Sequence, residues 1–572
     1  MVLVSPDKIQ AYSARQWWGE LTLWQLFEQR LAAHPEAEAV VDACNRPAFA
    51  HGAPRRLSWS DLGREVDRLC LHLVNLGLRK DDIVLAQMPN SVEQFIAYLA
   101  CARLGLVLSP VPVQYRAHEL GHVLALTQAR AVLTFERIAK HETRAMWQAL
   151  AAAHAHLGHL LHWGGADSLD ALPWADDAGR QRLVQAERAA AVSANDVFTI
   201  CWTSGTEAVP KGVPRSHNEW MVVTPSIIEA ADLQAGARLL NPFPLINMAG
   251  LSTAFVTWLV LGATVVQHQP FDLTVFLEQL RTERIDYTVS PPAILNTLLQ
   301  NEALLEGIDF KRLARIGSGS APLSPWMVQG FEQRFGVRIV NYFGSNEGAA
   351  LSSSDIDVPD PALRAQFFPR AGAGGHEWRI STTRKIRTRL VDLDTGQDIS
   401  ENGRPGELRF AGATIFSGYF RAPELTARAF DDQGFYCSGD LFEIAGERGQ
   451  FYRYVGRSKD IVIRGGVNIS SEEIESLLTG HPAVQEVAVV AVPDALLGEK
   501  LCACVVPRPG LTLSLPDLQH YLRQDKQAAI YKCPEYLMSL DSLPRNAVGK
   551  ILKRELREQA RLLAPTELAG AA

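Results

Sequence analysis

The sequence predicts an α/β protein. A large N-terminal domain of mixed and parallel sheets with flanking helices is followed by a small, mobile α+β C-terminal domain. The chain of 572 residues is too long for one hydrophobic core. Apolar runs alternate with segments of helical period through its first half, as in sheets of largely parallel strands. From Arg384 the pattern changes to short strands between turns. We therefore assign residues 1–457 to the N-terminal domain, with a β subdomain at about 384–457, and residues 458–572 to the C-terminal domain.

Helices and strands alternate along the N-terminal half. Thr22-Leu-Trp-Gln25 has the spacing of a capping box, and Pro35 ends the helix that it opens. Apolar residues at helical spacing predict further helices at residues 57–79, 92–104, 146–153, 218–232, 273–283 and 293–300. Short apolar runs predict strands at residues 83–87, 106–112, 131–135, 197–202 and 287–290.

Two later strands run into turns that contain glycine, at residues 316–323 and 337–348. In open α/β sheets such turns, at the carboxyl ends of strands, line the ligand crevice. The β subdomain has predicted strands at residues 386–391, 407–411 and 451–455. In the C-terminal domain, Ser470-Ser-Glu-Glu473 caps a helix. The remaining predicted elements there are strands at residues 487–492 and 501–506 and a helix at 516–529.

Composition excludes several classes of function. The net charge is −7 and no basic block occurs, so we predict binding neither to nucleic acid nor to an anionic membrane surface. The eight cysteines form no C-x-x-C pair, which is typical of reduced thiols in a cytoplasmic protein. Residues 1–16 carry charges throughout and lack the apolar core of a signal peptide. We therefore expect a cytoplasmic protein.

One segment is long and apolar enough to suggest a membrane span. Residues 239–267 contain no Asp, Glu, Lys or Arg. However, Asn, Pro and Gly residues interrupt the segment, and lipid would leave the freed backbone groups without partners. We expect instead a loop, a buried helix near residues 253–261 and a strand near 264–268.

A run of histidines suggests a metal site. The spacing is not i,i+4 throughout, and no Cys or carboxylate lies among them, so the usual zinc ligand patterns are not met. We favour a surface helix followed by a strand over a metal site for this run, which comprises His154, His156, His159 and His162.

The stretch from Thr199 to Pro214 has the composition of a phosphate-binding loop. A short apolar strand leads into Thr203, Ser204, Gly205 and Thr206, and Lys211 follows. Small residues with exposed backbone N–H groups, together with one cation, suit a polyphosphate. The spacing is not that of the common phosphate loop, and a hydroxyl-rich turn is usually only a turn. Taken alone, the stretch is compatible with either interpretation.

Five motifs in one order make the assignment specific. They are Thr203-Ser-Gly-Thr206 with Pro210-Lys-Gly212, Phe343-Gly-Ser-Asn-Glu347, Tyr436-Cys-Ser-Gly-Asp440, Gly456-Arg-Ser-Lys-Asp460 with Gly465-Gly-Val-Asn-Ile469, and Pro544-Arg-Asn-Ala-Val-Gly-Lys550. From about Thr22 to Arg557 the chain resembles the adenylate-forming superfamily, which includes acyl- and aryl-CoA synthetases, nonribosomal adenylation domains and firefly luciferase. Ser438 and Phe343 stand where this family usually has Thr and Tyr.

The resemblance implies that a small carboxylic acid attacks the α-phosphate of ATP, giving an acyl-adenylate and pyrophosphate. It makes Lys550 the catalytic residue that bridges the carboxylate and the α-phosphate, where negative charge develops. Glu347 is the implied ligand of Mg²⁺, a metal that prefers oxygen donors. Asp440 and Arg457 are implied to hold the ribose hydroxyls, and Phe343 to stack on adenine. The full implied ATP/AMP-binding set is Thr203, Ser204, Gly205, Thr206, Lys211, Gly319, Ser320, Ala321, Phe343, Gly344, Asn346, Asp440 and Arg457.

The resemblance also implies a second step, in which the acyl group passes to the thiol of coenzyme A. The C-terminal domain is expected to rotate about Lys459, withdrawing Lys550 and bringing Gly465 and Gly466 to line a pantetheine tunnel. Asn247 and Met248 are the expected contacts for the carboxylic acid or the thiol. Amino-acid-activating relatives usually carry an Asp in this region, so an amino acid substrate is not expected. With Leu251 and Trp220 nearby, we expect a pocket for an apolar acyl or aryl group.

Several interpretations stay open. Glu207 and Ala208 depart from the Thr-Gly usual in the phosphate loop, and a carboxylate there would repel a triphosphate unless it points away or meets the metal. The leading hypothesis is an acyl- or aryl-CoA synthetase. The first alternative is a ligase that loads the acid onto the phosphopantetheine arm of a carrier protein. The second is a catalytically impaired nucleotide-binding relative. Luciferase-like oxidation has no supporting residue.

Overall fold

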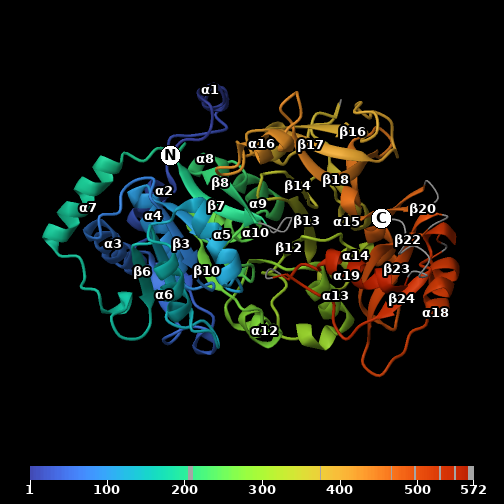
Figure 1. Ribbon diagram of the computed structural model, residues 1–572, viewed down its shortest axis with the longest axis horizontal. Coiled ribbons are helices and arrows are strands. Elements are labelled where there is room, and N and C mark those ends of the chain that lie inside the picture. Colours follow the sequence, from blue (N-terminus) through green and yellow to red (C-terminus); the bar gives the residue numbers. More distant parts are fainter. Residues whose placement is uncertain are drawn as a thin grey trace.

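The computed structural model describes residues 1–203, 210–373, 375–464, 467–494, 497–526, 528, 530–546 and 549–563, with only the backbone of Lys459, Val467 and Asn468. Figure 1 shows the N-terminal half in blue and green, the β subdomain in orange above it, and the C-terminal part in red at one end. No helix in the described ranges is long and apolar enough to cross a membrane.

Two mostly parallel sheets form the N-terminal body, as the alternating pattern predicts. The six-stranded sheet has the order β6-β5-β3-β4-β7-β8, and the eight-stranded sheet has the order β14-β13-β12-β11-β9-β10-β1-β2. Only β8, β14 and β2 pair antiparallel to their neighbours within these sheets. The strands are β1 (Glu38–Val41), β2 (Arg56–Ser58), β3 (Ile83–Gln87), β4 (Val107–Pro110), β5 (Ala131–Phe135), β6 (His159–Trp163), β7 (Val197–Thr203), β8 (Lys211–Ser216), β9 (Arg238–Asn241), β10 (Thr264–Gln267), β11 (Tyr287–Val289), β12 (Arg315–Gly319), β13 (Arg338–Gly344) and β14 (Ala350–Ser353).

Helices cover these sheets and fill the space between them. Every residue of α4 is buried, and the core around it combines side chains from both sheets. Trp59 and Trp258 stack in this core with ring centroids 4.6 Å apart. The helices of the body are α1 (Pro6–Ala14), α2 (Leu23–Ala33), α3 (Trp59–Asn75), α4 (Val92–Leu104), α5 (Ala117–Thr127), α6 (Thr143–Ala153), α7 (Asp177–Ala190), α8 (His217–Met221), α9 (Thr224–Ala231), α10 (Met248–Gly250), α11 (Thr257–Leu261), α12 (Leu273–Thr282), α13 (Pro292–Gln300), α14 (Pro325–Phe335) and α15 (Pro361–Gln366).

The predicted capping box at Thr22 is confirmed, because the Thr22 side chain accepts a hydrogen bond from Gln25 N and the Gln25 side chain accepts one from Thr22 N. Several expected helix bounds were wrong. The helix expected at 516–529 is α18 (Leu515–His520) followed by a π-helical turn, Tyr521–Asp525, where the helical residues end. Residues 56–58 form strand β2, and helix α3 begins only after the capping residue Ser58. The helix expected at 218–232 is split into α8 and α9. The segment 239–267 forms β9, a short α- and π-helical stretch and β10, so the expected loop, helix and strand are present.

In the histidine run, His154 caps the end of α6, His156 lies in the turn that follows, and His159 and His162 are in strand β6. Among the residues that the structure describes, no group of three or more His, Cys, Asp or Glu side chains is arranged to hold a metal ion.

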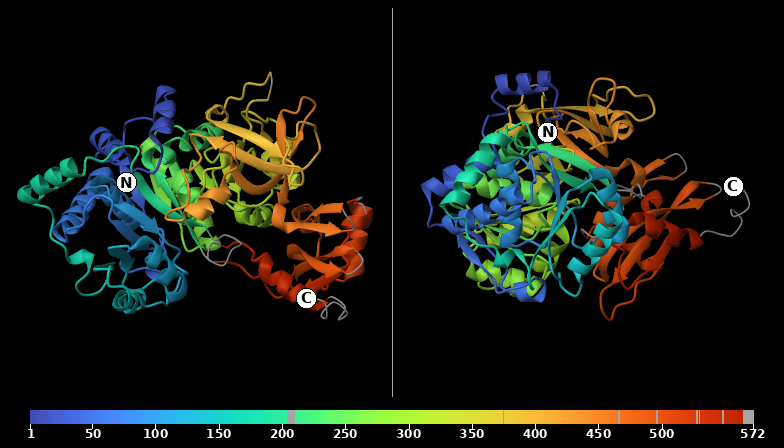
Figure 2. Two further views of the ribbon diagram at one scale, coloured as in Figure 1. Left: turned by 45° about the horizontal axis from the view of Figure 1, so that its top comes forward. Right: turned by 60° about the vertical axis from the view of Figure 1, so that its left-hand side comes forward.

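The β subdomain is an antiparallel sheet of order β15-β19-β18-β17-β16. The C-terminal part has a second sheet, in which β24 joins the order β21-β20-β23-β22, with helices packed on it (Figure 2). These elements are β15 (Phe367–Pro369), β16 (Ile386–Val391), β17 (Gly406–Gly412), α16 (Pro423–Ala429), β18 (Tyr436–Ala445), β19 (Phe451–Arg457), β20 (Ile461–Arg464), β21 (Val467–Ser470), α17 (Ser471–Thr479), β22 (Val484–Asp494), β23 (Gly498–Pro507), α18 (Leu515–His520), β24 (Tyr536–Ser539) and α19 (Lys553–Ala560).

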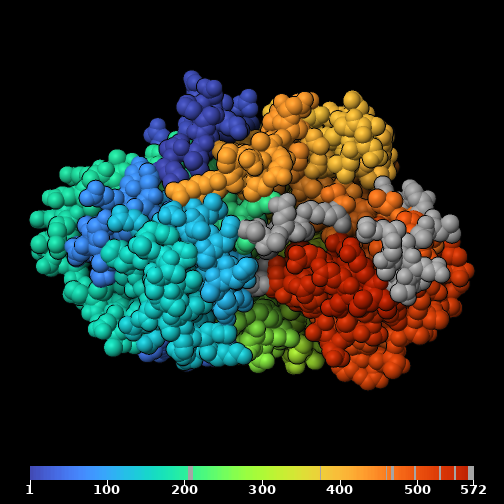
Figure 3. Space-filling view, viewed as in Figure 1, coloured from blue at the N-terminus to red at the C-terminus, as the bar shows by residue number. Residues whose placement is uncertain are grey.

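The C-terminal part lies against the N-terminal body. Figure 3 shows it in red beside the green part of the body and below the orange β subdomain. Arg508 donates a hydrogen bond of 2.8 Å to Oε1 of Gln300, at the end of α13. A single 3₁₀ turn, Ser458–Asp460, connects the two parts directly after β19.

Candidate active site

Several strands end at the same edge of the N-terminal body. Strand β7 ends at Thr203, β12 at Gly319 and β13 at Gly344. Thr203 pairs with Lys211 across the β7–β8 hairpin, so the phosphate-loop candidate is the turn of this hairpin. Ser204, Gly205 and Thr206 lie outside the described residues, as do the two departures from the family pattern, Glu207 and Ala208.

Lys211 and Glu347 both contact the side chain of Tyr419. The Lys211 ammonium lies 5.3 Å from the centre of the Tyr419 ring. The Tyr419 hydroxyl donates a hydrogen bond of 2.9 Å to Oε1 of Glu347. Tyr419 therefore connects the cation expected at the phosphates with the carboxylate expected at the metal. The sequence did not indicate Tyr419, which lies 72 residues beyond Glu347.

Asn346 ties three segments of the site together. Its Oδ1 accepts a hydrogen bond of 2.7 Å from the backbone N–H of Met248, and its Nδ2 donates one of 3.3 Å to the carbonyl of Trp202. Buried Arg215 donates to the Asn346 carbonyl at 3.1 Å. Asn247 caps α10, because its Oδ1 accepts a hydrogen bond from Gly250 N at 3.2 Å. The amides of Asn346 and Asn247 thus hold the start of α10 beside the end of β7.

The expected adenine-binding backbone follows β12. A Cβ atom on Gly319 would lie 2.3 Å from the carbonyl oxygen of Tyr342, so only glycine fits between these strands. Ser320 has φ +70° and is exposed together with Ala321. The partly buried Phe343 ring contacts an aromatic cluster of the β subdomain, comprising Phe368, Phe410, Phe442 and Tyr454. Gly344, the last residue of β13, is exposed.

Asp440 and Arg457 form a cross-strand pair in the β18–β19 ladder. Arg457 Nε donates a hydrogen bond of 3.0 Å to Oδ1 of Asp440, whose side chain is buried. Burial raises the pKa of Asp440 to about 6, although the Arg457 cation opposes this shift. The carboxylate therefore becomes an ionised hydrogen-bond acceptor only above this pH.

Lys550 lies within electrostatic range of this pair, although more than 90 residues separate it from Arg457 in the sequence. Its side chain reaches solvent. The surrounding protein nevertheless limits its hydration, and this desolvation, with the nearby Arg457 cation, lowers the pKa of Lys550. Asp440 acts in the opposite direction and raises the pKa of Lys550. The loop is held by Asn546, whose Oδ1 accepts a hydrogen bond of 2.8 Å from Lys550 N.

The expected hinge residue Lys459 lies in the connecting 3₁₀ turn, and the structure describes only its backbone. Gly465 and Gly466 also lie outside the described residues. Met248 is buried in the same apolar core as Leu251 and Trp220. The indole N–H of Trp220 donates a hydrogen bond of 2.8 Å to Thr199 Oγ1.

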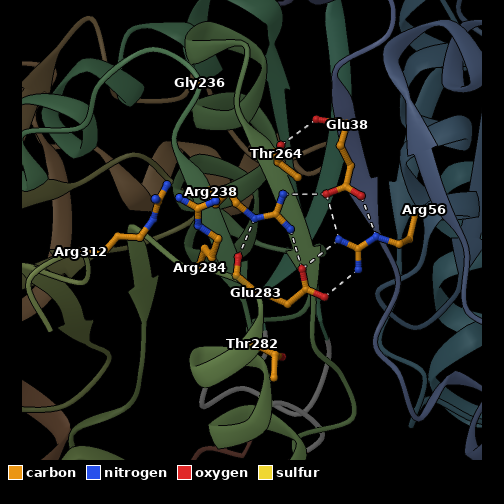
Figure 4. A pocket seen from close by; sticks show the side chains of 9 residues that line it. All are labelled: Glu38, Arg56, Gly236, Arg238, Thr264, Thr282, Glu283, Arg284 and Arg312. Carbon is orange, nitrogen blue, oxygen red and sulfur yellow. Dashed lines mark hydrogen bonds and ion pairs between the residues drawn. The ribbon is translucent and has the colours of Figure 1, made fainter. Parts of the chain in front are cut away.

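A hollow of about 520 Å³ lies elsewhere (Figure 4). It is at the amino ends of β1, β9 and β10, whereas the candidate site is at carboxyl ends. Four side chains beside it form a closed ring of ion pairs: Arg56 with Glu38 and Glu283, and Arg238 with the same two glutamates. Because the ring neutralises its own charges, we assign it a structural role.

Comparisons with known proteins identify the family of the chain. The model of the family "AMP-binding enzyme" matches residues 27–420, and that of "AMP-binding enzyme C-terminal domain" matches residues 473–550. The chain is 29% identical to medium-chain fatty-acid–CoA ligase of Escherichia coli, covering 96% of this chain and 92% of that protein. It is 29% identical to pyochelin synthase PchD of Pseudomonas aeruginosa, covering 94% and 93%. It is 30% identical to 2-hydroxy-7-methoxy-5-methyl-1-naphthoate–CoA ligase of Streptomyces carzinostaticus, covering 98% and 97%.

Solved structures of similar enzymes superpose on most of the chain. ATP-bound MatB from Rhodopseudomonas palustris is 27% identical and superposes with a TM-score of 0.75, covering 95% of this chain and 100% of that chain. The apo form of MatB, with the same identity and coverage, superposes with a TM-score of only 0.66. The chain belongs to the AMP-binding enzymes of the adenylate-forming superfamily.

Proposed function

We propose that this protein is an acid–thiol ligase that activates a carboxylic acid with ATP and transfers the acyl group to coenzyme A. The observation that carries the proposal is the position of Lys550 within electrostatic range of the Asp440–Arg457 pair. Lys550 is on the C-terminal part and the pair is on the β subdomain, so the fold gathers charged groups from three motifs.

In the first step, an oxygen of the substrate carboxylate attacks the α-phosphorus of ATP. The new O–P bond forms as the bond from the α-phosphorus to the bridging oxygen breaks, and pyrophosphate leaves. Negative charge grows on the α-phosphate oxygens, and we assign its stabilisation to the Lys550 ammonium, which can also orient the carboxylate. Asp440 and Arg457 would hold the ribose hydroxyls, the carboxylate as acceptor and the guanidinium as donor.

Glu347 fits the role of a Mg²⁺ ligand. Its Oε1 is held by the Tyr419 hydroxyl, and the side chain is buried beside the hairpin that carries Lys211. Mg²⁺ is usually bound in such sites by one or two carboxylates together with substrate phosphates. When bound, the ion would neutralise phosphate charge and polarise the phosphoryl group.

In the second step, the thiol sulfur attacks the acyl carbonyl, the C–O bond to AMP breaks and AMP leaves. We propose that the C-terminal part, residues 458–572, turns about Lys459 between the two steps and that Gly465 and Gly466 then line the path of the pantetheine arm. The higher TM-score against ATP-bound than against apo MatB supports an arrangement suited to the first step.

For the substrate we propose an acid with an apolar acyl or aryl group. Met248, Leu251 and Trp220 belong to one buried apolar core, and an apolar group would suit a pocket beside it. One relative is named for a fatty acid and another for a naphthoate, and these names support an acyl and an aryl group respectively. A second candidate acceptor is the phosphopantetheine arm of a carrier protein. The chain is as similar to a pyochelin synthase as it is to CoA ligases, and this supports the second candidate.

Two assays on the purified chain test the proposal. Carboxylate-dependent ATP–pyrophosphate exchange is measured across a panel of fatty and aryl acids, and thioester formation is then measured with and without coenzyme A. We expect exchange with at least one acid and a coenzyme A thioester of that acid. Exchange without a coenzyme A thioester would favour the carrier protein as acceptor. No exchange with any acid would favour a catalytically impaired relative.

A further inference from the structure

Two side-chain contacts cross the connection between the N-terminal body and the C-terminal part. The Tyr454 hydroxyl, on β19, donates a hydrogen bond of 3.3 Å to Oε1 of Glu472, in the first turn of α17. The hydroxyl of Ser470, which caps α17, donates to the carbonyl of Val455 and accepts from Glu473 N. Both contacts join a residue before the 3₁₀ turn at Ser458–Asp460 to a residue after it. Rotation about that turn must therefore change them.

Tyr454 is held by aromatic contacts before the connecting turn, in the β subdomain. Its ring lies 5.2 Å from that of Phe442 and 6.1 Å from that of Phe343, measured between ring centroids. Strand β19, which carries it, also carries Arg457. The Tyr454 hydroxyl therefore marks a fixed point close to the expected nucleotide site.

On the other side of the connection, α17 is tied to the helix that follows Lys550. Lys553, the first residue of α19, donates a hydrogen bond of 2.8 Å to Ser471 Oγ and pairs with Glu475 at 2.7 Å. Glu475 also accepts a hydrogen bond of 2.6 Å from Val489 N, so this pair is fixed to strand β22. Lys553 is only three residues beyond Lys550. The position of α17 thus sets the position of the catalytic loop.

Glu472 has a free carboxylate oxygen at this junction. Its Oε2 is buried and has no hydrogen-bond partner among the described residues. The carboxylate lies within electrostatic range of Lys550, Asp440 and Arg457. A buried carboxylate oxygen without a hydrogen bond is costly, and the nearby cations of Lys553 and Arg457 offset that cost. Because Lys553 follows the connecting turn, as Glu472 does, whereas Arg457 precedes it, rotation about that turn would move Glu472 relative to Arg457 and to the Tyr454 hydroxyl.

We propose that Glu472 is a positioning residue for Lys550. Its hydrogen bond to Tyr454 and its charge hold α17, and with it the Lys550 loop, in the arrangement used for adenylation. The inference rests on the proposed function, because it assumes that Lys550 acts in the first step and leaves before the second. Loss of the contact should slow adenylation and leave transfer from preformed acyl-AMP unchanged or faster.

The test compares Tyr454→Phe and Glu472→Gln with the matched control Tyr452→Phe. Tyr452 lies on the same strand, but its hydroxyl bonds Thr388 at 3.0 Å inside the β subdomain and does not cross the connection. Two rates are measured: ATP–pyrophosphate exchange, and single-turnover thioester formation from purified acyl-AMP. For Tyr454→Phe we expect kcat of exchange to fall about tenfold, as for one hydrogen bond to a charged group, with the KM for ATP little changed.

Glu472→Gln keeps an oxygen that can accept from Tyr454 but removes the negative charge, so it should weaken this contact and also lower the rate of exchange. The double variant should lose little more than Tyr454→Phe alone, because both changes act on one contact. Tyr452→Phe should leave both rates unchanged. The proposal is overturned if Tyr454→Phe and Glu472→Gln leave exchange unchanged, or if they slow both steps equally, as general damage to the fold would. A wild-type protein that shows no exchange with any acid would refute the proposed function itself.

Discussion

Asp440 should make nucleoside binding depend on pH, and a variant at this position separates its effect from that of the histidines, which titrate in the same range. Burial raises the pKa of Asp440 to about 6. A carboxylate ionises as pH rises, so the acceptor for the ribose hydroxyls is present above this pKa and is lost as pH falls through it. With a pKa of about 6, the ionised fraction is about 97% at pH 7.5 and about 9% at pH 5.

The expected size of the effect follows from that fraction. A hydrogen bond to a charged acceptor contributes about 1.5–3 kcal/mol, which is roughly 10- to 150-fold in affinity. Because about a tenth of Asp440 stays ionised at pH 5, the affinity for the nucleoside should fall by about tenfold between pH 7.5 and pH 5. Protonation of Asp440 would also leave Arg457 without its hydrogen-bonded anion.

The assay is the dissociation constant of adenosine, measured by calorimetry at several pH values. Adenosine is used because the phosphates of ATP have an ionisation of their own near pH 6, which would obscure that of the protein. The matched control is Asp440→Asn, which should bind adenosine weakly and equally at all these pH values. The reasoning is refuted if wild-type affinity is the same at pH 5 and pH 7.5, or if the Asn variant keeps the pH dependence.

Three further predictions follow from the site and the sheets. Lys550→Ala should lower the rate of ATP–pyrophosphate exchange by about 10²–10³-fold while adenosine still binds, and unchanged exchange would remove Lys550 from the mechanism. Lys459→Pro should slow thioester formation more than exchange, because it stiffens the connection, whereas equal slowing would count against domain rotation. Glu283→Gln opens the ion-pair ring at the hollow and should lower the free energy of unfolding by about 0.5–1 kcal/mol at low salt, with a smaller loss at 1 M salt. Arg64→Gln, at a highly exposed pair with Asp61, is its control. An equal loss of stability in both variants would argue against a structural role of the ion-pair ring.

Local signals in the sequence predicted much of the fold. The capping box at Thr22 needs only residues three apart, and the alternation of strands and helices needs only periodicity. The helix expected at 57–79 was wrong at its start because residues 56–58 pair with β1, and that strand pairing is a tertiary contact. The helix expected at 218–232 is also broken, after α8, and Pro225 at the second position of α9 marks this break in the sequence.

The sequence indicated the candidate site residues that belong to a motif. It did not indicate the contacts between side chains that are far apart in the sequence. The Asp440–Arg457 pair joins two predicted motifs, and the structure adds that they face each other on adjacent strands. Tyr419 and Glu472 were not predicted, because each is defined by a partner far away in the sequence or across the connecting turn. The hydrogen bonds of Asn346 to Met248 and Trp202 are of the same kind, and no spacing rule reports them.

One measurement tests the central claim most directly. The protein is given ATP, coenzyme A and an active carboxylic acid labelled with ¹⁸O in both carboxylate oxygens, and the products are analysed by mass spectrometry. If the carboxylate attacks the α-phosphorus and the thiol then breaks the acyl C–O bond, AMP must carry one ¹⁸O atom and pyrophosphate none. Unlabelled AMP, or ADP with the label in inorganic phosphate, would contradict an acyl-adenylate intermediate.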